Sequence, residues 1–293
     1  MPRLSIITTC KGRLHHLRRS LPRFLAQPDC EVIVVDYDCP DGTAAVVARE
    51  FSAAHVVAVK DRPHFDISEA RNLGAAAATG EWLAFIDADI VIAPNFHARL
   101  APQLQPGTFY RFPPRRDSSL WGSCVMRRED FLAAGRYDEV MQGYGGDDQD
   151  MYFRLDLAGL KVQALGFDLV AEVIEHDTAD RIRFGRLPSM LHHQRQNGAY
   201  LIVKTTLLRM LGPAGLSPEQ CQTVYRLVGD VVNDANRKPD VPIHFSIELP
   251  PDPHGVSVPA WMAKRQVVFD LTPTELLEAD EDGRFDAAPT PSP

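Results

Sequence analysis

The sequence predicts an α/β fold in which helices cover both faces of a mostly parallel central sheet. Over the first hundred residues, short apolar runs alternate with segments of helical spacing, and this alternation is typical of such a sheet. The chain has 293 residues, of which 45% are hydrophobic and 24% charged. These values suit one large domain with an appendage and exclude collagens, coiled coils and wholly disordered chains.

The elements of this first region follow one another in a regular order. Apolar, β-branched runs predict strands at residues 4–8, 31–35, 55–59 and 82–86. Helical spacing of apolar or small residues predicts helices between them, at residues 14–25, 43–51 and 67–79. Pro22 is expected to kink or shorten the first helix. Asp66 or Ser68 is expected to cap the third, and Gly80 to end it.

Beyond residue 107 the pattern is less regular. It predicts a strand at residues 122–127 and a strand-like run at residues 161–174. It also predicts helices at residues 129–134, 147–159, 188–211 and 218–236, with a glycine-rich loop at residues 143–146. We therefore expect four parts: the two halves of the main domain, a helical C-terminal extension, and a disordered tail rich in proline and acid, at residues 1–106, 107–180, 181–270 and 271–293.

Charge and composition exclude several classes of protein. The net charge is −8, from 31 Lys and Arg against 39 Asp and Glu, which argues against nucleic-acid binding. No apolar run approaches the roughly 18 residues of a membrane helix, and the apolar run near the start is too short for a secretory signal. The five scattered cysteines form no CxxC pair, as expected of reduced thiols. We therefore expect a cytoplasmic protein. The run at residues 200–211 is expected to pack as a core helix, with peripheral contact at the inner membrane face as the alternative.

Polar residues gather where the predicted strands end. Thr8 and Thr9 follow the first strand, and Asp87-Ala88-Asp89 follows the fourth. Ligands of such sheets bind outside the carboxyl ends of the strands. Two carboxylates placed two apart suit Mg²⁺ or Mn²⁺, although turn-forming aspartates at a strand end are the simpler alternative.

A second acidic group lies in the run GYGGDDQD, residues 143–150. Asp147 or Asp148 could cap the helix that starts there, which explains one carboxylate but not three. A carboxylate behind flexible glycines could also take a proton from an incoming hydroxyl. His176 follows the strand-like run; a lone histidine is usually structural, but this one could complete a metal site.

Taken in order, these segments resemble a known family. LSIITT, VVDYDCPDGT and ISEARNLGAAAATGEWLAFIDADI resemble glycosyltransferase family 2 and its relatives with the GT-A fold. WGSCVMRREDFLAAGRYDEVMQGYGGDDQDMYFRL is similar to the galactosyltransferase-type motif of β-1,4-galactosyltransferases and polypeptide N-acetylgalactosaminyltransferases. The resemblance covers about residues 3 to 180. It implies a Rossmann-like GT-A fold, with nucleotide-sugar binding in residues 1–106 and acceptor binding and catalysis in residues 107–180.

The resemblance also implies roles for the acidic residues. Asp89 matches a direct ligand of Mn²⁺ (or Mg²⁺), Asp87 matches a residue that contacts ribose or the ion's water shell, and His176 matches a further ligand. Asp148 matches the general base, and Asp147 the neighbour that binds acceptor or donor sugar. Retaining relatives commonly carry an asparagine at the second acid, so Asp148 favours inversion.

Further donor contacts are implied at Thr8, Thr9, Arg13, Asp36, Tyr37, Asp38, Arg71, Ala88 and Trp121. Tyr37 replaces the second aspartate of the family's VDDGS stretch and could stack on the nucleobase. Arg71 could instead form a helix-surface ion pair with Glu69 or Asp66. Trp121 could stack on a pyranose or belong to the core.

We therefore expect a metal-dependent, inverting glycosyltransferase. It would move a hexose or N-acetylhexosamine from a nucleotide-sugar, most simply a UDP-hexose, to a glycan, a lipid-linked acceptor or a small molecule. A retaining enzyme of the same fold is the alternative. A nucleotidyltransferase is disfavoured because residues 8–13 hold only one glycine. A non-catalytic binding module is disfavoured by the clustered acids.

Overall fold

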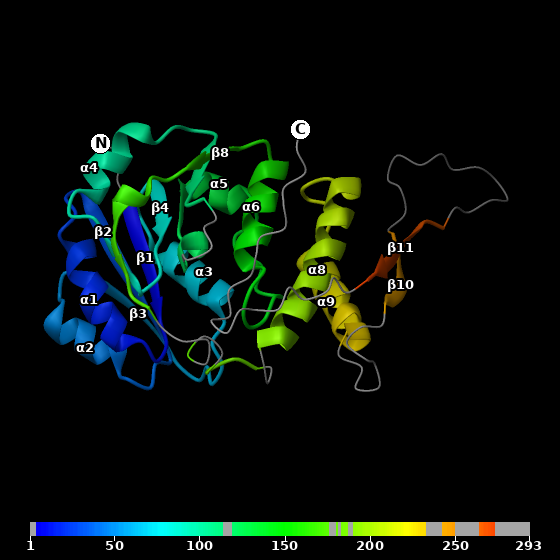
Figure 1. Ribbon diagram of the computed structural model, residues 1–293, viewed down its shortest axis with the longest axis horizontal. Coiled ribbons are helices and arrows are strands. Elements are labelled where there is room, and N and C mark those ends of the chain that lie inside the picture. Colours follow the sequence, from blue (N-terminus) through cyan, green and yellow to red (C-terminus); the bar gives the residue numbers. More distant parts are fainter. Residues whose placement is uncertain are drawn as a thin grey trace.

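A seven-stranded sheet forms the centre of the computed structural model, which describes residues 4–113, 119–175, 180, 183–186, 190–232, 242–249 and 264–272. The strands lie in the order β3-β2-β1-β4-β7-β6-β8 (Figure 1). Their bounds are β1 Leu4–Cys10, β2 Cys30–Tyr37, β3 His55–Val59, β4 Trp82–Phe85, β6 Thr108–Arg111, β7 Cys124–Arg127 and β8 Lys161–Ala164. All neighbours are parallel except β7, which is antiparallel to β4 and β6. The predicted mostly parallel sheet is confirmed.

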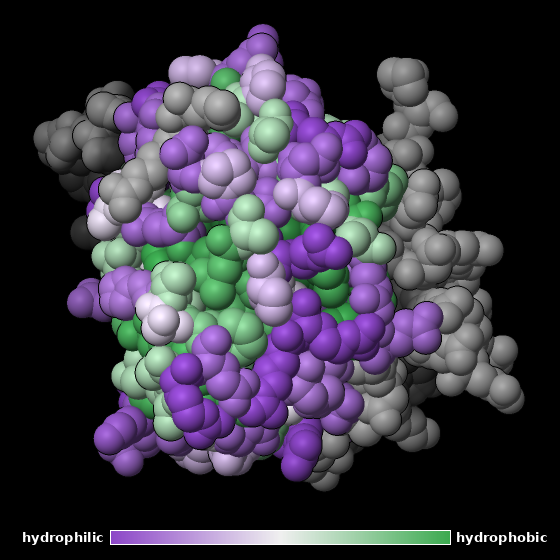
Figure 2. Space-filling view, turned by 90° about the vertical axis from the view of Figure 1, so that its left-hand side faces the viewer, coloured by the Kyte–Doolittle hydropathy of each residue, from purple (hydrophilic) through white to green (hydrophobic). Residues whose placement is uncertain are grey.

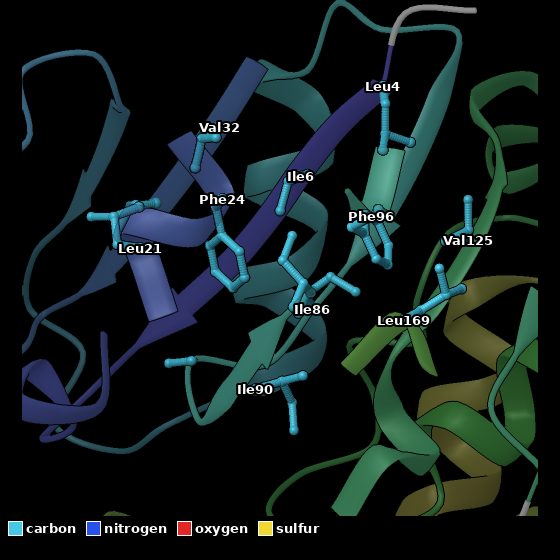
Figure 3. Packing of buried hydrophobic residues seen from close by; sticks show 14 of the residues in the cluster. Leu4, Ile6, Leu21, Phe24, Val32, Ile86, Ile90, Phe96, Val125 and Leu169 are labelled. Carbon is cyan, nitrogen blue, oxygen red and sulfur yellow. The ribbon is translucent and has the colours of Figure 1, made fainter. Parts of the chain in front are cut away.

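Helices cover both faces of this sheet because its strands are apolar on both sides. Ile6 of β1 belongs to one buried cluster, with side chains of α1, α2 and α4, while Ile7 belongs to the other, with side chains of α3, α5 and α6. Figure 3 shows Phe24 of α1 beside Ile6 and Ile86 in the first cluster. The helices are α1 Leu14–Leu25, α2 Thr43–Glu50, α3 Ile67–Ala77, α4 Phe96–Leu100, α5 Arg128–Ala133 and α6 Asp147–Leu157, with short 3₁₀ turns at Ala101–Gln103, Ser119–Gly122 and Phe167–Leu169. Seen from the left-hand side of Figure 1, the surface is hydrophilic around a smaller apolar area (Figure 2).

Two details of the helices differ from or sharpen the predictions. The expectation that Pro22 shortens α1 is wrong, because the helix continues through it to Leu25. Asp66 is the cap of α3, since its side chain accepts a hydrogen bond from the backbone N–H of Glu69 at 3.1 Å.

The strand-like run at residues 161–174 separates into two strands. Only its first part, β8, joins the main sheet, whereas β9 (Val170–Val173) pairs antiparallel with β5 (Ile90–Ile92). The small β5–β9 sheet was not predicted. It brings the end of this run alongside the strand that follows Asp87-Ala88-Asp89.

The C-terminal extension contains the two predicted helices, α8 (Met190–Leu211) and α9 (Pro218–Val232). It also contains an antiparallel strand pair that was not predicted, β10 (Ile243–Glu248) and β11 (Gln266–Leu271). These elements share a third apolar cluster, and α8 lies beside α6 (Figure 1). Lys204 of α8 is 4% exposed and pairs with Asp138 at 2.7 Å and Asp150 at 2.6 Å. The run at residues 200–211 is therefore a packed helix.

Among the helices in the described ranges, none is long and apolar enough to cross a membrane. Residues 273–293, most of the predicted tail, lie outside the described residues.

Candidate active site

The first acidic pair lies in a turn between β4 and β5. The carbonyl oxygen of Asp87 accepts a hydrogen bond from the backbone N–H of Ile90 at 3.0 Å. Asp89 is 4% exposed, and one of its carboxylate oxygens lies 3.3 Å from Nη1 of Arg13. The Asp87 side chain keeps 28% of its surface exposed and binds an arginine rather than a turn amide. The simpler explanation, aspartates that only form the turn, therefore does not describe Asp87.

That arginine is Arg71 of α3, which joins the two acidic groups. Its Nη1 donates to Asp147 at 2.8 Å and to Asp148 at 2.5 Å, and its Nη2 donates to Asp87 at 3.1 Å. The residue is only 2% exposed. The alternative of a surface ion pair with Glu69 or Asp66 is wrong. One guanidinium group thus binds a carboxylate of the first acidic pair, Asp87, and two carboxylates of the second acidic group, Asp147 and Asp148.

Gly122 leaves the space in which these groups approach one another. Its carbonyl oxygen accepts a hydrogen bond from Nη2 of Arg71 at 3.2 Å. A Cβ atom at this position would lie 2.8 Å from Nη2 of Arg71, 3.0 Å from Oδ2 of Asp148 and 3.1 Å from Oδ2 of Asp87. These separations are shorter than van der Waals contact, so any side chain at position 122 would push the cluster apart.

The cluster carries more negative than positive charge. Burial raises the pKa of Asp87 and of Asp147, and it raises the pKa of Asp148 to about 7, although the Arg71 guanidinium opposes each shift. Asp87, Asp147 and Asp148 share one cation, Arg71, and Asp89 pairs with Arg13. Four carboxylates beside these two guanidinium groups suit a divalent cation, and carboxylate oxygens are ligands that Mn²⁺ and Mg²⁺ prefer.

The third predicted metal ligand, His176, lies outside the described residues. Within the ranges that the structure describes, no three metal-ligating side chains gather at one point. The backbone N–H of Ile174, however, donates to the carbonyl oxygen of Asp89 at 2.8 Å. This contact places the end of β9 beside Asp89, and a role for His176 as a ligand stays a prediction. The carboxylates of the cluster are of the chemical type that the predicted ion prefers.

The glycine-rich loop that precedes Asp147 is held by the C-terminal helices. Asn197 of α8, which is 1% exposed, donates from Nδ2 to the carbonyl oxygens of Gln142, Tyr144 and Gly145 at 3.1, 3.4 and 2.9 Å. The Tyr225 hydroxyl of α9 donates to Oδ1 of Asn197 at 3.0 Å. A single amide thus connects the loop to both helices.

His193 lies against the same loop. Its Nδ1 accepts a hydrogen bond from the backbone N–H of Tyr144 at 3.3 Å, and its ring fills the space that a Cβ on Gly143 would need. Gly143 has φ +81°, a conformation that favours glycine. The sequence analysis missed both His193 and Asn197. Their spacing of four, which places them on one face of a helix, is a signal that could have identified them.

Asn197→Ala should loosen this loop. The substitution leaves three part-buried carbonyl oxygens without their shared donor, and an unsatisfied polar group that is fully buried typically costs about 1–3 kcal/mol. We expect amide hydrogen exchange at residues 143–149 to speed up by roughly tenfold or more, measured by mass spectrometry. Gln194→Ala, on the same helix, should leave these rates unchanged. Equal rates in the two variants would show that Asn197 does not hold the loop.

The residues at the end of β2 that were predicted to contact the nucleobase mostly form hydrogen bonds within the protein. Tyr37 is 1% exposed, its hydroxyl donates to Glu69, and Phe65 meets it edge-on, so the expectation that its ring stacks on a nucleobase is wrong. Asp36 accepts hydrogen bonds from the backbone N–H groups of Cys39 at 2.8 Å and of the first turn of α2 at 2.6 Å. Asp38 accepts one from the backbone N–H of residue 62 at 3.0 Å. Donor contacts of Asp36 and Asp38 stay predictions.

The remaining predicted donor residues lie at the ends of other elements. Thr8 is 1% exposed, and its hydroxyl has no hydrogen-bond partner within the described part of the chain. Thr9 is half-buried, and Ala88 is buried beside the acidic pair. The Trp121 ring packs edge-on against Tyr152 at 6.0 Å, with the Arg111 guanidinium 4.3 Å from its centroid. Contacts of Thr8, Thr9 and Trp121 with the donor stay predictions.

Two protein-family models match the chain in the region of this site. Residues 5–123 match the model of glycosyl transferase family 2, and residues 110–177 match the model described as the N-terminal domain of galactosyltransferase. The matches overlap and together run from residue 5 to residue 177. The chain is a glycosyltransferase. Among curated protein sequences, none matches this glycosyltransferase.

Solved structures share the fold of the glycosyltransferase. The mannosyltransferase PcManGT from Pyrobaculum calidifontis, in complex with GDP-Man and Mn²⁺, is 16% identical, with a TM-score of 0.52, and the alignment covers 81% of this chain and 77% of that one. TarS 1-349 from S. aureus is 14% identical, with a TM-score of 0.54 and coverage of 80% and 73%. The structure of TarS 1-349 in complex with UDP-GlcNAc is 13% identical, with a TM-score of 0.56, and the alignment covers 77% of this chain and 71% of that one. At such identities the likeness concerns the fold, which is GT-A.

Proposed function

We propose that this glycosyltransferase moves a hexose or N-acetylhexosamine from a UDP-linked donor to an acceptor hydroxyl, with a divalent metal ion and with inversion at the anomeric carbon. The observation that carries the proposal is the set of hydrogen bonds from Arg71 to Asp87 on one side and to Asp147 and Asp148 on the other. Transfer requires the donor diphosphate and the acceptor hydroxyl to lie on opposite sides of one anomeric carbon, and this arginine holds their proposed binding groups next to each other.

The metal ion would be held by Asp87 and Asp89, with His176 as the third side chain. The excess negative charge of the cluster supports this assignment, and a neighbour of the same fold was solved with Mn²⁺. When bound, the ion would neutralise the charge that develops on the departing nucleoside diphosphate. Arg13, 3.3 Å from Asp89, keeps that carboxylate oriented.

Removal of the metal should abolish donor binding. We expect calorimetry to show UDP binding in the presence of Mn²⁺ and its loss on addition of a chelator, because phosphate and buried carboxylates repel each other without a cation. Asp89→Ala and His176→Ala should each weaken UDP binding by about tenfold or more, the cost of one lost contact of roughly 1.4 kcal/mol. UDP binding that the chelator leaves unchanged would contradict the metal assignment.

Asp148 would act as the general base. It lies in the first turn of α6, where the helix dipole favours a carboxylate. Arg71 holds its Oδ1, while its Oδ2 lies beside Gly122, which has no side chain to cover it. This second oxygen would take the proton of the acceptor hydroxyl as the hydroxyl oxygen attacks the anomeric carbon. Asp147, held by the same guanidinium, would bind a sugar hydroxyl.

The acceptor would enter from the side of the C-terminal helices. A cavity of about 560 Å³ opens beside the glycine-rich loop and is lined by Gln142, Gln196, Gln222, Tyr225 and Arg226, among others. Amide, hydroxyl and guanidinium groups suit the hydroxyls of a glycan. This supports an acceptor role for residues 107–180 together with residues 181–270.

One assay separates the proposed function from its alternatives. Manganese-dependent hydrolysis of a panel of UDP-, GDP- and CDP-sugars, without acceptor, should release the free sugar and the nucleoside diphosphate. Release of a sugar phosphate would indicate a nucleotidyltransferase, and no turnover would indicate a binding module. The anomeric configuration of a transfer product, read by nuclear magnetic resonance, distinguishes inversion from retention.

A further inference from the structure

Two cysteines lie together at the edge of the sheet where the donor is proposed to bind. Cys10 is the last residue of β1, and Cys39 lies in the loop after β2. In the parallel ladder Cys10 is opposite Asp36, whose carboxylate accepts a hydrogen bond from the backbone N–H of Cys39 at 2.8 Å. This contact folds the loop back toward β1. As a result, the backbone N–H of Gly12 donates to the Cys39 sulfur at 3.0 Å.

The two thiols differ in chemical character. Cys39 packs against the buried cluster that contains Cys10, and the Cys10 sulfur lies 3.3 Å from the Thr43 hydroxyl. The hydrogen bond from Cys10 lowers the pKa of Cys39 to about 6, and further bonds from Thr43, Gly12 and Asp41 outweigh the opposing effect of burial. Cys10 is 1% exposed and its pKa is raised, first by the same hydrogen bond and then by burial.

The remaining cysteines provide an internal comparison. Burial raises the pKa of Cys30 and of Cys124, each to about 12, and Cys221 is buried with a raised pKa. Only a thiolate is a strong nucleophile. Cys39 is half-buried, and the backbone N–H that donates to its sulfur favours the thiolate, so we expect it to be the most reactive of these thiols.

We propose that Cys39 is an oxidative modification site that reacts with hydroperoxides, and that Cys10 then closes a disulfide with it. The Cys39 thiolate attacks one peroxide oxygen, the O–O bond breaks, and the leaving alkoxide or hydroxide takes a proton from solvent. Cys39 becomes a sulfenic acid. The Cys10 sulfur then attacks the Cys39 sulfur, and hydroxide leaves with the Cys10 proton as water. The two thiols lose two electrons, and the hydroperoxide gains them.

This disulfide would link the end of β1, which contains Thr8 and Thr9, to the end of β2 and the loop after it, which contain Asp36 and Asp38. Both segments lie at the carboxyl ends of their strands, where ligands of such sheets bind. If the proposed donor site is correct, oxidation should therefore weaken UDP binding. The chemical step itself does not depend on that proposal.

The test uses the full-length reduced protein with the Cys30→Ser substitution, so that Cys39 is the only cysteine of its tryptic peptide. Brief treatment with hydrogen peroxide, followed by iodoacetamide, should give a mass loss of about 2 Da and one linked pair of peptides, Cys10 with Cys39. Cys10→Ser should stop the reaction at the sulfenic acid of Cys39, trapped by dimedone. Cys221→Ser, the matched control, should behave as the parent. Linkage through other cysteines, or Cys39 oxidation no faster than that of Cys124 and Cys221, would overturn the proposal.

A second measurement separates the modification from the donor site. Calorimetry with UDP and Mn²⁺ should show at least about tenfold weaker binding after oxidation, about 1.4 kcal/mol, and recovery after dithiothreitol. A disulfide that forms without changing UDP affinity would overturn the link to the donor loops. If the reduced protein does not bind UDP at all, the proposed function fails, while the peptide map still decides whether Cys39 is the modification site.

Discussion

Asp148→Asn should lower the rate of sugar transfer by at least about a hundredfold, because a general base typically contributes about 10² to 10⁴ in rate. Asparagine keeps the shape of the side chain, and its amide oxygen can still accept the hydrogen bond from Arg71, so the protein should fold. UDP affinity, measured by calorimetry, should change little, since the base acts in the transition state rather than in donor binding.

Two further measurements check this role. The pKa of Asp148 is raised to about 7 by burial, and a carboxylate base acts only when ionised. Transfer should therefore rise with pH up to about 7 and then level off, and this dependence should disappear in Asp148→Asn. Asp147→Asn is the control, with UDP binding intact and transfer less affected. If Asp147→Asn loses transfer while Asp148→Asn stays active, the base is Asp147.

Arg71→Met should destabilise the protein more than any other single substitution at the site. It leaves the buried Asp147 and the part-buried Asp87 and Asp148 without their shared cation, and breaking a buried ion pair typically costs about 3–5 kcal/mol. For a protein of this size, that loss corresponds to a fall in melting temperature of roughly 10 °C. Donor binding should be lost as well, because Asp87 would no longer be held.

The pH dependence of this destabilisation has a definite sign. Without the guanidinium, the pKa values of the three carboxyl groups rise further above their unfolded values. Such groups are neutral below the folded pKa and carry unpaired charge above it, so Arg71→Met should cost more stability at pH 8 than at pH 5. The control is Arg18→Met, which removes an exposed pair with Glu50 and should change stability by no more than about 1 kcal/mol. Equal melting temperatures for the two variants would contradict the structural role of Arg71.

Most of the fold could be predicted from the sequence because each element carries its own periodicity. The run at residues 55–59 is apolar and β-branched, and it forms β3 with those bounds. The run at residues 161–174 is strand-like throughout, so its division between the main sheet and the β5–β9 pair was not visible. Which partner a strand chooses depends on contacts far along the chain, and local spacing does not record them.

The candidate site could be predicted as residue types but not as an arrangement. Asp87, Asp89, Asp147 and Asp148 could be identified because the order of the motifs resembles a glycosyltransferase family and because a helix cap explains only one carboxylate of the second group. Arg71 was placed near the nucleotide, but its partners on α6 lie 76 and 77 residues away. Tyr37 was misread because the pattern shows that it ends a strand, whereas its burial follows from which face of β2 it occupies. Asn197 acts through backbone carbonyls, which carry no side-chain signal.

The separation between Arg71 and its partners has a consequence for synthesis of the chain. A ribosome adds roughly 5–20 residues per second, so Arg71 leaves it several seconds before Asp147 and Asp148 do. Until then Asp87, 16 residues away, is the one carboxylate partner of Arg71 in this cluster that has been synthesised. The sheet is also incomplete at that stage, because β7 has not yet paired with β4. Residues 1–106 should therefore remain only partly ordered while the second half is translated, and a gene cut after residue 106 should yield no independently folded donor-binding fragment.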